Sequence, residues 1–93
     1  FTAMKRAKKP SESVFPVLTP YAFKILRKRR RALKLSQQLV ADKTGVSRSK
    51  ICAMEAGKRP RMSMSEIEIV ANVLGMTLQT LLALADQYRL EKA

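Results

Sequence analysis

Residues 35–59 read LSQQLVADKTGVSRSKICAMEAGKR, and this stretch predicts two short helices around a tight turn. Ser36 and Ser47 are N-cap candidates, because a serine hydroxyl can accept hydrogen bonds from the free N–H groups that begin a helix. Gly45 and Gly57 can take the positive φ at which helices commonly end. The stretch therefore predicts one helix of about seven residues after Ser36 and a second one that begins after Ser47 and ends before Gly57.

The apolar residues of this stretch recur at spacings that let both helices bury one side against a shared core. They are Leu35, Val40, Ala41, Val46, Ile51 and Met54. Small or basic side chains remain outside at the front of the second helix, namely Arg48, Ser49, Cys52 and Ala53. This arrangement is typical of a helix-turn-helix whose second helix enters the major groove of DNA.

The stretch resembles the Cro/repressor-type helix-turn-helix family, whose usual pattern is L-S-Q-x-x-L-A-x-x-x-G-V-S-x-x-x-I-x-x-x-E-x-G-K-R. The matching residues are Leu35, Ser36, Gln37, Ala41, Gly45, Val46, Ser47, Ile51, Glu55, Gly57, Lys58 and Arg59. Val40 takes the place of the common leucine, and the resemblance covers residues 21–85. It implies an all-α, five-helix, phage-repressor-like DNA-binding domain.

Composition agrees with one small helical domain, since 93 residues with three glycines and four prolines leave little room for the turns of an all-β chain. The net charge of +12 predicts attraction to polyanions. Residues 1–34 carry eleven Lys and Arg against one Glu, whereas residues 62–93 carry two against four acids. The basic surface therefore belongs to the first two-thirds of the chain.

Residues 1–19 are predicted to form a basic, Pro-containing extension, and residues 20–93 the domain. Three prolines in the first twenty residues argue against a helix there. The extension is either a disordered basic tail or an arm that lies along DNA, with residues 14–18 packed in extended form on the domain or on a dimer mate. Thr19 and Pro20 are predicted as the N-cap and first residue of the first helix.

In that first helix, Leu26 and Leu33 are the expected core anchors. The family resemblance implies that Arg30 pairs with Glu55, and a guanidinium suits a carboxylate at a helix junction; the alternative is that Arg30 is one more solvated charge. After Pro60, the sequence predicts a capping box, a helix ending at Gly75 and a last helix capped by Thr77. The capping-box residues are Ser63 and Glu66, and the apolar residues expected to face inward from the helix that follows are Met64, Ile67, Val70, Ala71 and Leu74.

The resemblance implies the residues that contact DNA. Arg48, Ser49 and Ala53 are expected at base edges, where Arg48 can bond guanine and Ala53 can touch a thymine methyl; Arg48 on a phosphate is the alternative. Cys52 is expected close to the groove. The expected phosphate contacts are Gln37, Ser47, Lys50, Lys58, Arg59 and Arg61.

The last predicted helix has more leucines than one buried face needs, namely Leu78, Leu81, Leu82 and Leu84, and this excess indicates a self-association surface. Leu78, Leu81 and Leu82 are the predicted dimer contacts, and a helix that merely completes the core is the alternative. A two-fold dimer would place its second helices about 34 Å apart on an inverted-repeat operator. The predicted function is therefore a transcriptional regulator, most simply a repressor, that binds double-stranded DNA.

Two other roles stay open. The apolar residues 14–18 favour a DNA-binding antitoxin that also holds a toxin protein, and the high charge alone would suit a protein that coats nucleic acid without sequence preference. An enzyme, a metal site or a cofactor is not expected, because the chain has no histidine, one cysteine and no phosphate-binding glycine loop. A single cysteine and apolar runs far below about 20 residues predict a cytoplasmic protein without a membrane span.

Overall fold

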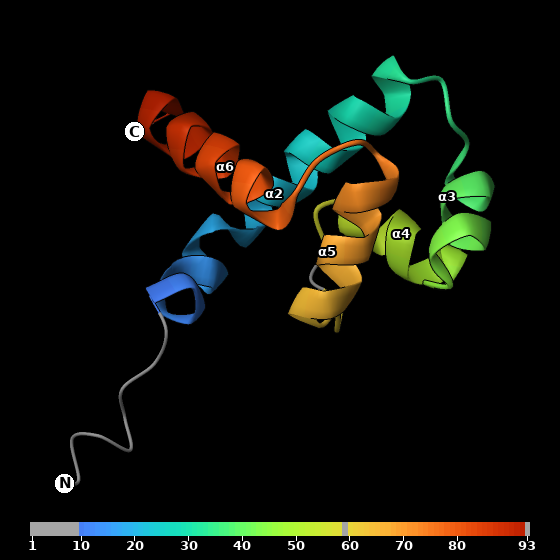
Figure 1. Ribbon diagram of the computed structural model, residues 1–93, viewed down its shortest axis with the longest axis horizontal. Helices are drawn as coiled ribbons and strands as arrows, with labels where there is room; N and C mark the ends of the chain where they lie inside the picture. The colour runs from blue at the N-terminus through green and yellow to red at the C-terminus, as the bar shows by residue number, and fades with distance from the viewer. Residues whose placement is uncertain (1–9, 59, 93) are drawn as a thin grey trace, which may run out of the picture.

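The computed structural model describes residues 10–58 and 60–92, with side chains from residue 18 onward. This described part of the chain forms five helices and no strand (Figure 1). They are α2 (Pro10–Ala32), α3 (Gln37–Thr44), α4 (Arg48–Glu55), α5 (Met64–Val73) and α6 (Leu78–Lys92). The predicted all-α, five-helix fold is confirmed.

The longest helix, α2, runs along one side of the domain and packs chiefly against α6. Figure 1 shows α3 and α4 together at the end of the molecule away from α6, with α5 between the two groups. α5 contacts both α3 and α6, and α4 contacts α2. The pair α3–α4 is therefore supported from behind by α2 and α5.

One core joins all five helices. The largest wholly buried side chains come from every helix and are Leu26, Val40, Ile51, Met54, Ile67, Val70, Leu74 and Leu81. Most of the residues expected to face inward from the α3–α4 stretch and from α5 lie in this core, while Leu35 is only partly buried and packs against it. Met64, also expected inward, is partly exposed.

The start of the first helix differs from the prediction. α2 begins at Pro10 and continues through Pro16 and Pro20, so Thr19 does not cap it and residues 14–18 are helical instead of extended. Pro10 fits the first position of a helix, where its missing N–H has no helical partner to lose. Each interior proline costs about 3 kcal/mol or more, but this part of α2 buries Leu18, Ala22 and Phe23 in the core, and burying each large apolar side chain contributes about 1.5–3 kcal/mol. Tertiary packing therefore overrides the local preference of the prolines. The predicted basic arm, residues 1–9, lies outside the described part of the chain.

The end of α2 also corrects one expectation. Leu33 is 42% exposed, because the helix ends at Ala32 and Leu33 already follows the last turn. Lys34 then takes φ 60°, and Leu35 N donates to Arg30 O over 3.1 Å, as in the Schellman motif of glycine-ended helices. Phe23, 6% exposed, is a core residue of α2 that the sequence analysis did not single out.

The predicted signals around α5 and α6 are confirmed. Ser63 and Glu66 form both hydrogen bonds of the capping box, Gly75 has φ 85°, and Thr77 Oγ1 accepts from Thr80 N over 3.0 Å. The terminal carbonyl of α5 gains a further donor, because Arg29 Nε donates to Leu74 O over 2.9 Å. Arg29 thus joins α2 to the α5–α6 turn.

Candidate nucleic-acid interface

The α3–α4 pair is a helix-turn-helix with both helix starts capped as predicted. Ser36 Oγ accepts from Leu39 N over 3.0 Å, and Ser47 Oγ accepts from Lys50 N over 3.2 Å. Gly45, at φ 78°, forms the left-handed turn after α3. Buried Val46 follows it, so the turn is fixed to the core and holds α4 at a set angle.

α4 has two distinct faces. Ile51 and Met54 are at most 1% exposed and fix the inner face to the core. The groups left on the outer side are Arg48, Ser49 and Cys52, which are exposed, and Ala53, which is half-buried. These are the four residues predicted to face the bases, and the structure brings them together along one helix. Short side chains after an arginine leave room for base edges to approach, and the arginine can supply the bidentate bond that guanine accepts.

Arg30 and Glu55 form a bidentate ion pair that ties α2 to the end of α4. Arg30 Nε lies 2.6 Å from Glu55 Oε2, and Arg30 Nη2 lies 2.7 Å from Oε1. The remaining guanidinium nitrogen donates to Leu35 O over 2.6 Å. Such a fork fixes the angle between the two helices more strictly than a single charge contact.

Gln37 joins this network instead of projecting outward. Its side-chain Nε2 donates to Glu55 Oε1 over 3.0 Å, so α2, α3 and α4 meet at one carboxylate. The predicted phosphate contact at Gln37 would therefore use the backbone N–H at the start of α3, where the helix dipole favours an anion. Nothing local in the sequence signals this side-chain bond, because its partners are 18 residues apart.

Opposing effects act on the pKa of Glu55. Burial alone raises it, but hydrogen bonds from Arg30 and Gln37 and the charges of Arg30 and Arg27 lower it, and the net pKa lies below the usual value. The bond to Glu55 raises the pKa of Arg30 despite partial burial. Both groups therefore stay charged at neutral pH.

A second ion pair ties the beginning of α4 to α5. Lys50 Nζ lies 3.1 Å from Glu66 Oε2, while Glu66 Oε1 accepts from Ser63 N over 2.9 Å. The bonds from Ser63 and Lys50 lower the pKa of this exposed carboxyl. Lys50, predicted as a phosphate contact, thus has a carboxylate partner in the free protein, and a phosphate would have to replace it.

The other predicted phosphate contacts lie around the two ends of α4. Ser47 is exposed at its start, and Lys58 and Arg61 are exposed beyond its end. Gly57, at φ 80°, turns the chain there, and Lys58 N donates to Ala53 O over 3.0 Å. Arg59, also predicted to grip the backbone, lies outside the described residues.

The structure separates the predicted dimer residues. Leu81 is wholly buried in the core, so it is unavailable to a second chain and its assignment to an interface is corrected. Leu78 and Leu82 are partly buried against the core. The large apolar side chains that α6 does expose are Leu84, 40% exposed, and Leu90, 61% exposed. Leu84 is among the excess leucines of this helix, whereas the sequence analysis did not single out Leu90.

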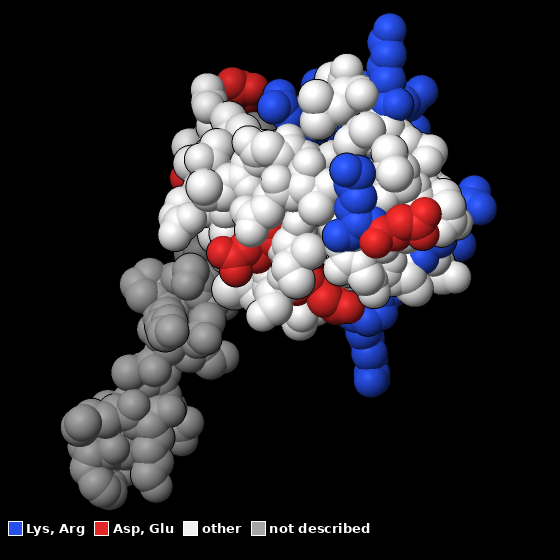
Figure 2. All heavy atoms as spheres, turned by 45° about the vertical axis from the view of Figure 1, so that its right-hand side comes forward, with Lys and Arg blue, Asp and Glu red and all other residues white. Residues whose placement is uncertain are grey.

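The face drawn in Figure 2 carries charges of both signs. Lys and Arg side chains project at several of its edges, with carboxylates between them. Among the described residues, no group of three or more His, Cys, Asp and Glu side chains lies close enough to hold a metal ion. No single described helix is long and apolar enough to span a membrane; α5 and α6 pass the length and composition test only as a pair bent by 95°.

A family model described as a helix-turn-helix domain matches residues 25–91 of the chain. The match covers α3, α4 and α5, the last eight residues of α2 and nearly all of α6. It confirms the predicted helix-turn-helix family and supports DNA binding. No curated protein and no solved structure matches the chain significantly.

Proposed function

This chain belongs to the helix-turn-helix domain family, and we propose that it is a transcriptional regulator that reads a specific double-stranded DNA sequence with α4 in the major groove. The observation that carries the proposal is the outer side of α4, where Arg48 stands beside small uncharged side chains. A helix meant only to attract phosphates would gain from more charge there, whereas base reading needs close approach.

The proposed roles follow from position on the domain. Arg48 bonds guanine O6 and N7, Ser49 bonds either base, and Cys52 and Ala53 lie against the apolar edge of thymine. Phosphates on either side are held by the backbone at the start of α3, at Gln37, by Ser47 and Lys50 at the start of α4, and by Lys58 and Arg61 beyond its end. Arg59, which lies outside the described residues, is also expected to contact a phosphate.

We expect the protein to bind as a homodimer, so that two α4 helices enter successive major grooves about 34 Å apart on an inverted repeat. Exposed Leu84 and Leu90 on α6 support an interface there, and Leu78 and Leu82 are partly buried against the core. A dimer seated over a promoter excludes polymerase, which makes repression the proposed outcome.

The dimer is tested by light scattering during size-exclusion chromatography over a range of concentrations. The double variant Leu84→Gln/Leu90→Gln is expected to elute as a monomer where the wild type is a dimer. Ile69→Gln is the matched control, because Ile69 is exposed to a similar degree on α5. Equal dimer fractions in the double variant and the wild type would place the interface elsewhere.

Specific reading is tested by selecting duplexes from a random pool and footprinting the selected site. Arg48→Ala is expected to lose discrimination at one base pair per half-site, with a cost of about 1–3 kcal/mol. Lys58→Ala should weaken binding to all sequences alike and lower the slope of log affinity against log salt concentration by about one unit per site. Equal affinity for selected and random duplexes at fixed salt would instead support a coating protein.

The antitoxin alternative loses part of its support. It depended on the apolar residues 14–18, and Leu18 is a core residue of the domain. Co-expression with the product of a neighbouring reading frame tests it. A stoichiometric complex that relieves growth arrest would establish a protein partner. Absence of a complex would favour the transcriptional regulator over the antitoxin.

A further inference from the structure

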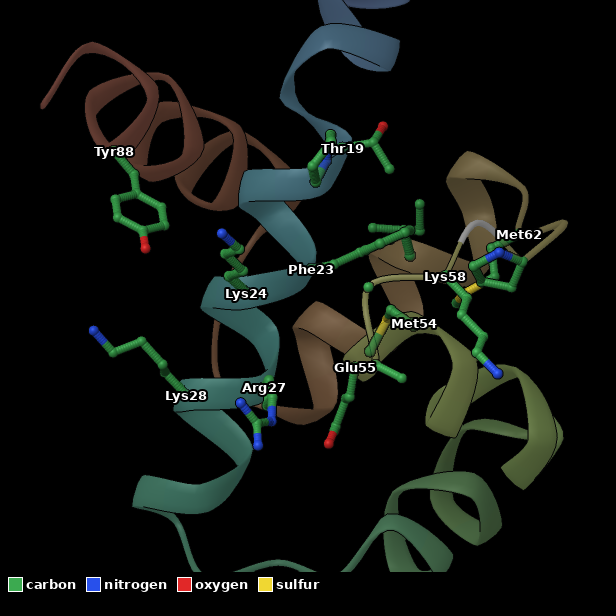
Figure 3. A pocket seen from close by; sticks show the side chains of 15 residues that line it. Thr19, Phe23, Lys24, Arg27, Lys28, Met54, Glu55, Lys58, Met62 and Tyr88 are labelled. Carbon is green, nitrogen blue, oxygen red and sulfur yellow. The ribbon is translucent and has the colours of Figure 1, made fainter. Parts of the chain in front are cut away.

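A groove of about 770 Å³ lies beside α2 and the connection from α4 to α5 (Figure 3). Its apolar lining includes Phe23, Met54, Met62 and Ile67. Figure 3 shows Phe23 pointing from α2 toward the side of the groove that holds Met54 and Met62. The volume falls within the range of about 300–1,000 Å³ that is usual for small-molecule sites.

Basic side chains surround this apolar lining. Lys24, Arg27 and Lys28 reach it from α2 and Lys58 from the α4–α5 connection, and all four are exposed. Glu55 is the single acidic residue among the described lining residues. Its carboxylate is already bonded by Arg30 and Gln37, and Arg27 is the one described rim cation whose charge lowers the pKa of Glu55.

The rim cations form no ion pair within the described part of the chain. The ion pairs found there involve Arg30, Lys50 and Arg89, none of which lines the groove. A simple phosphate bound here would leave the apolar lining uncovered. A neutral apolar ligand would leave the cations unmatched. The complementary occupant has both an anionic head and an apolar body.

We propose that this groove binds a small organic anion with an apolar body, of the size of a medium-chain carboxylate, and that the bound anion weakens DNA binding. The second half rests on the proposed function. Lys58 lines the groove and is also a proposed phosphate contact, so the ligand and DNA compete for one charge. Met54 and Glu55 belong to α4 and line the groove as well, so a ligand there touches the helix that reads DNA. By thermodynamic linkage, the anion lowers the affinity for DNA by the same factor by which DNA lowers the affinity for the anion.

The site is tested with anilinonaphthalene sulfonate, an apolar anion whose fluorescence rises on binding, and by its displacement with decanoate. Arg27→Glu is expected to weaken the binding of the probe and of decanoate by about tenfold, because attraction to the anionic head group becomes repulsion. Arg31→Glu is the matched control, since it makes the same charge change one turn further along α2 at an exposed residue outside the groove. Met62→Gln, which reduces the apolar lining, should also lower the affinity for decanoate.

Two results would overturn the site. One is equal loss of affinity in the Arg27→Glu and Arg31→Glu variants, which would mean attraction to overall charge. The other is displacement of the probe by decyltrimethylammonium, which has the same apolar body and the opposite charge, as readily as by decanoate.

The effect on DNA is measured separately by fluorescence anisotropy of the selected duplex with and without saturating decanoate. Wild type and Arg31→Glu should lose DNA affinity severalfold on adding decanoate, while Arg27→Glu should not respond. If saturating decanoate left the affinity for the duplex unchanged, the effector role would be overturned. A protein that binds no duplex at all would refute the proposed function instead, and the fluorescence titration would still decide the site.

Discussion

The substitution Glu55→Gln isolates the charge that joins three helices. The Glu55 side chain is 4% exposed and that of Arg30 15%. In the variant, an amide nitrogen faces the N–H donors of Arg30, and the guanidinium loses its counter-charge. Removing one partner of a buried pair costs about 3–5 kcal/mol. Because Arg30 keeps some contact with water and its bond to Leu35 O, we expect a loss of about 2–3 kcal/mol.

The assay is urea unfolding followed by far-UV circular dichroism. With a slope of about 1 kcal/mol per molar urea, the midpoint should fall by about 2–3 M. The matched control is Glu68→Gln, at an exposed position of α5, which should change the free energy of unfolding by less than about 0.5 kcal/mol. Equal losses in the two variants would refute the reasoning, since they would show that the Arg30–Glu55 contact adds nothing to stability.

The pH dependence gives an independent check. The folded pKa of Glu55 is lowered from the ordinary 4.5, so its contribution to stability is present above about pH 4.5 and is lost as the pH falls through the folded pKa. Wild type should therefore lose more stability than Glu55→Gln between neutral pH and acid. The lowered pKa of Glu66 acts in the same direction but is common to both proteins, so the difference between the curves belongs to Glu55. Parallel curves would contradict the lowered pKa.

Three further substitutions test local features by the same unfolding assay. Lys34→Gly should stabilise by about 1 kcal/mol, because Lys34 has φ 60° and glycine takes this conformation without strain, whereas Lys34→Gln, which removes the charge alone, should not. Ser63→Ala should destabilise by about 1 kcal/mol through loss of the cap, and Ser63→Gly by less; an unchanged stability in Ser63→Ala would mean that the hydroxyl contributes nothing. Leu81→Ala should cost about 2–5 kcal/mol independently of protein concentration, since Leu81 fills the core; a cost that grew on dilution would place it in an interface after all.

The features predictable from the sequence are the local ones. Ser36, Ser47 and Ser63 each accept the backbone hydrogen bond that their position implied, and Gly45 turns the chain with a positive φ. These signals work because the cap and its donor lie within one turn of each other, so the geometry is decided before the helices pack. The apolar spacing of α4 likewise placed Ile51 and Met54 inside.

The features that the sequence did not reveal depend on distant contacts. Two prolines argue locally against a helix through residue 20, but α2 continues through both and buries Leu18, Ala22 and Phe23 in the core. Leu81 and Leu84 are the same residue type three positions apart on one helix, yet one is wholly buried and the other 40% exposed. Which leucine faces inward follows from how α6 lies on α2, and local spacing does not contain that information.

The two ion pairs of α4 hold its first and last turns, and neither involves the exposed residues Arg48 and Ser49. Lys50 in the first turn binds Glu66 of α5, and Glu55 in the last turn binds Arg30 of α2. Both ends are therefore held from behind the groove-facing side, so the angle of α4 does not depend on Arg48 or Ser49, which are exposed. Substitutions at exposed positions of this kind usually change stability by less than about 0.5 kcal/mol, whereas a base contact contributes about 1–3 kcal/mol of discrimination. Under the proposed function, substitutions at Arg48 and Ser49 would therefore change the sequence that the domain reads while the support of α4 stays as it is.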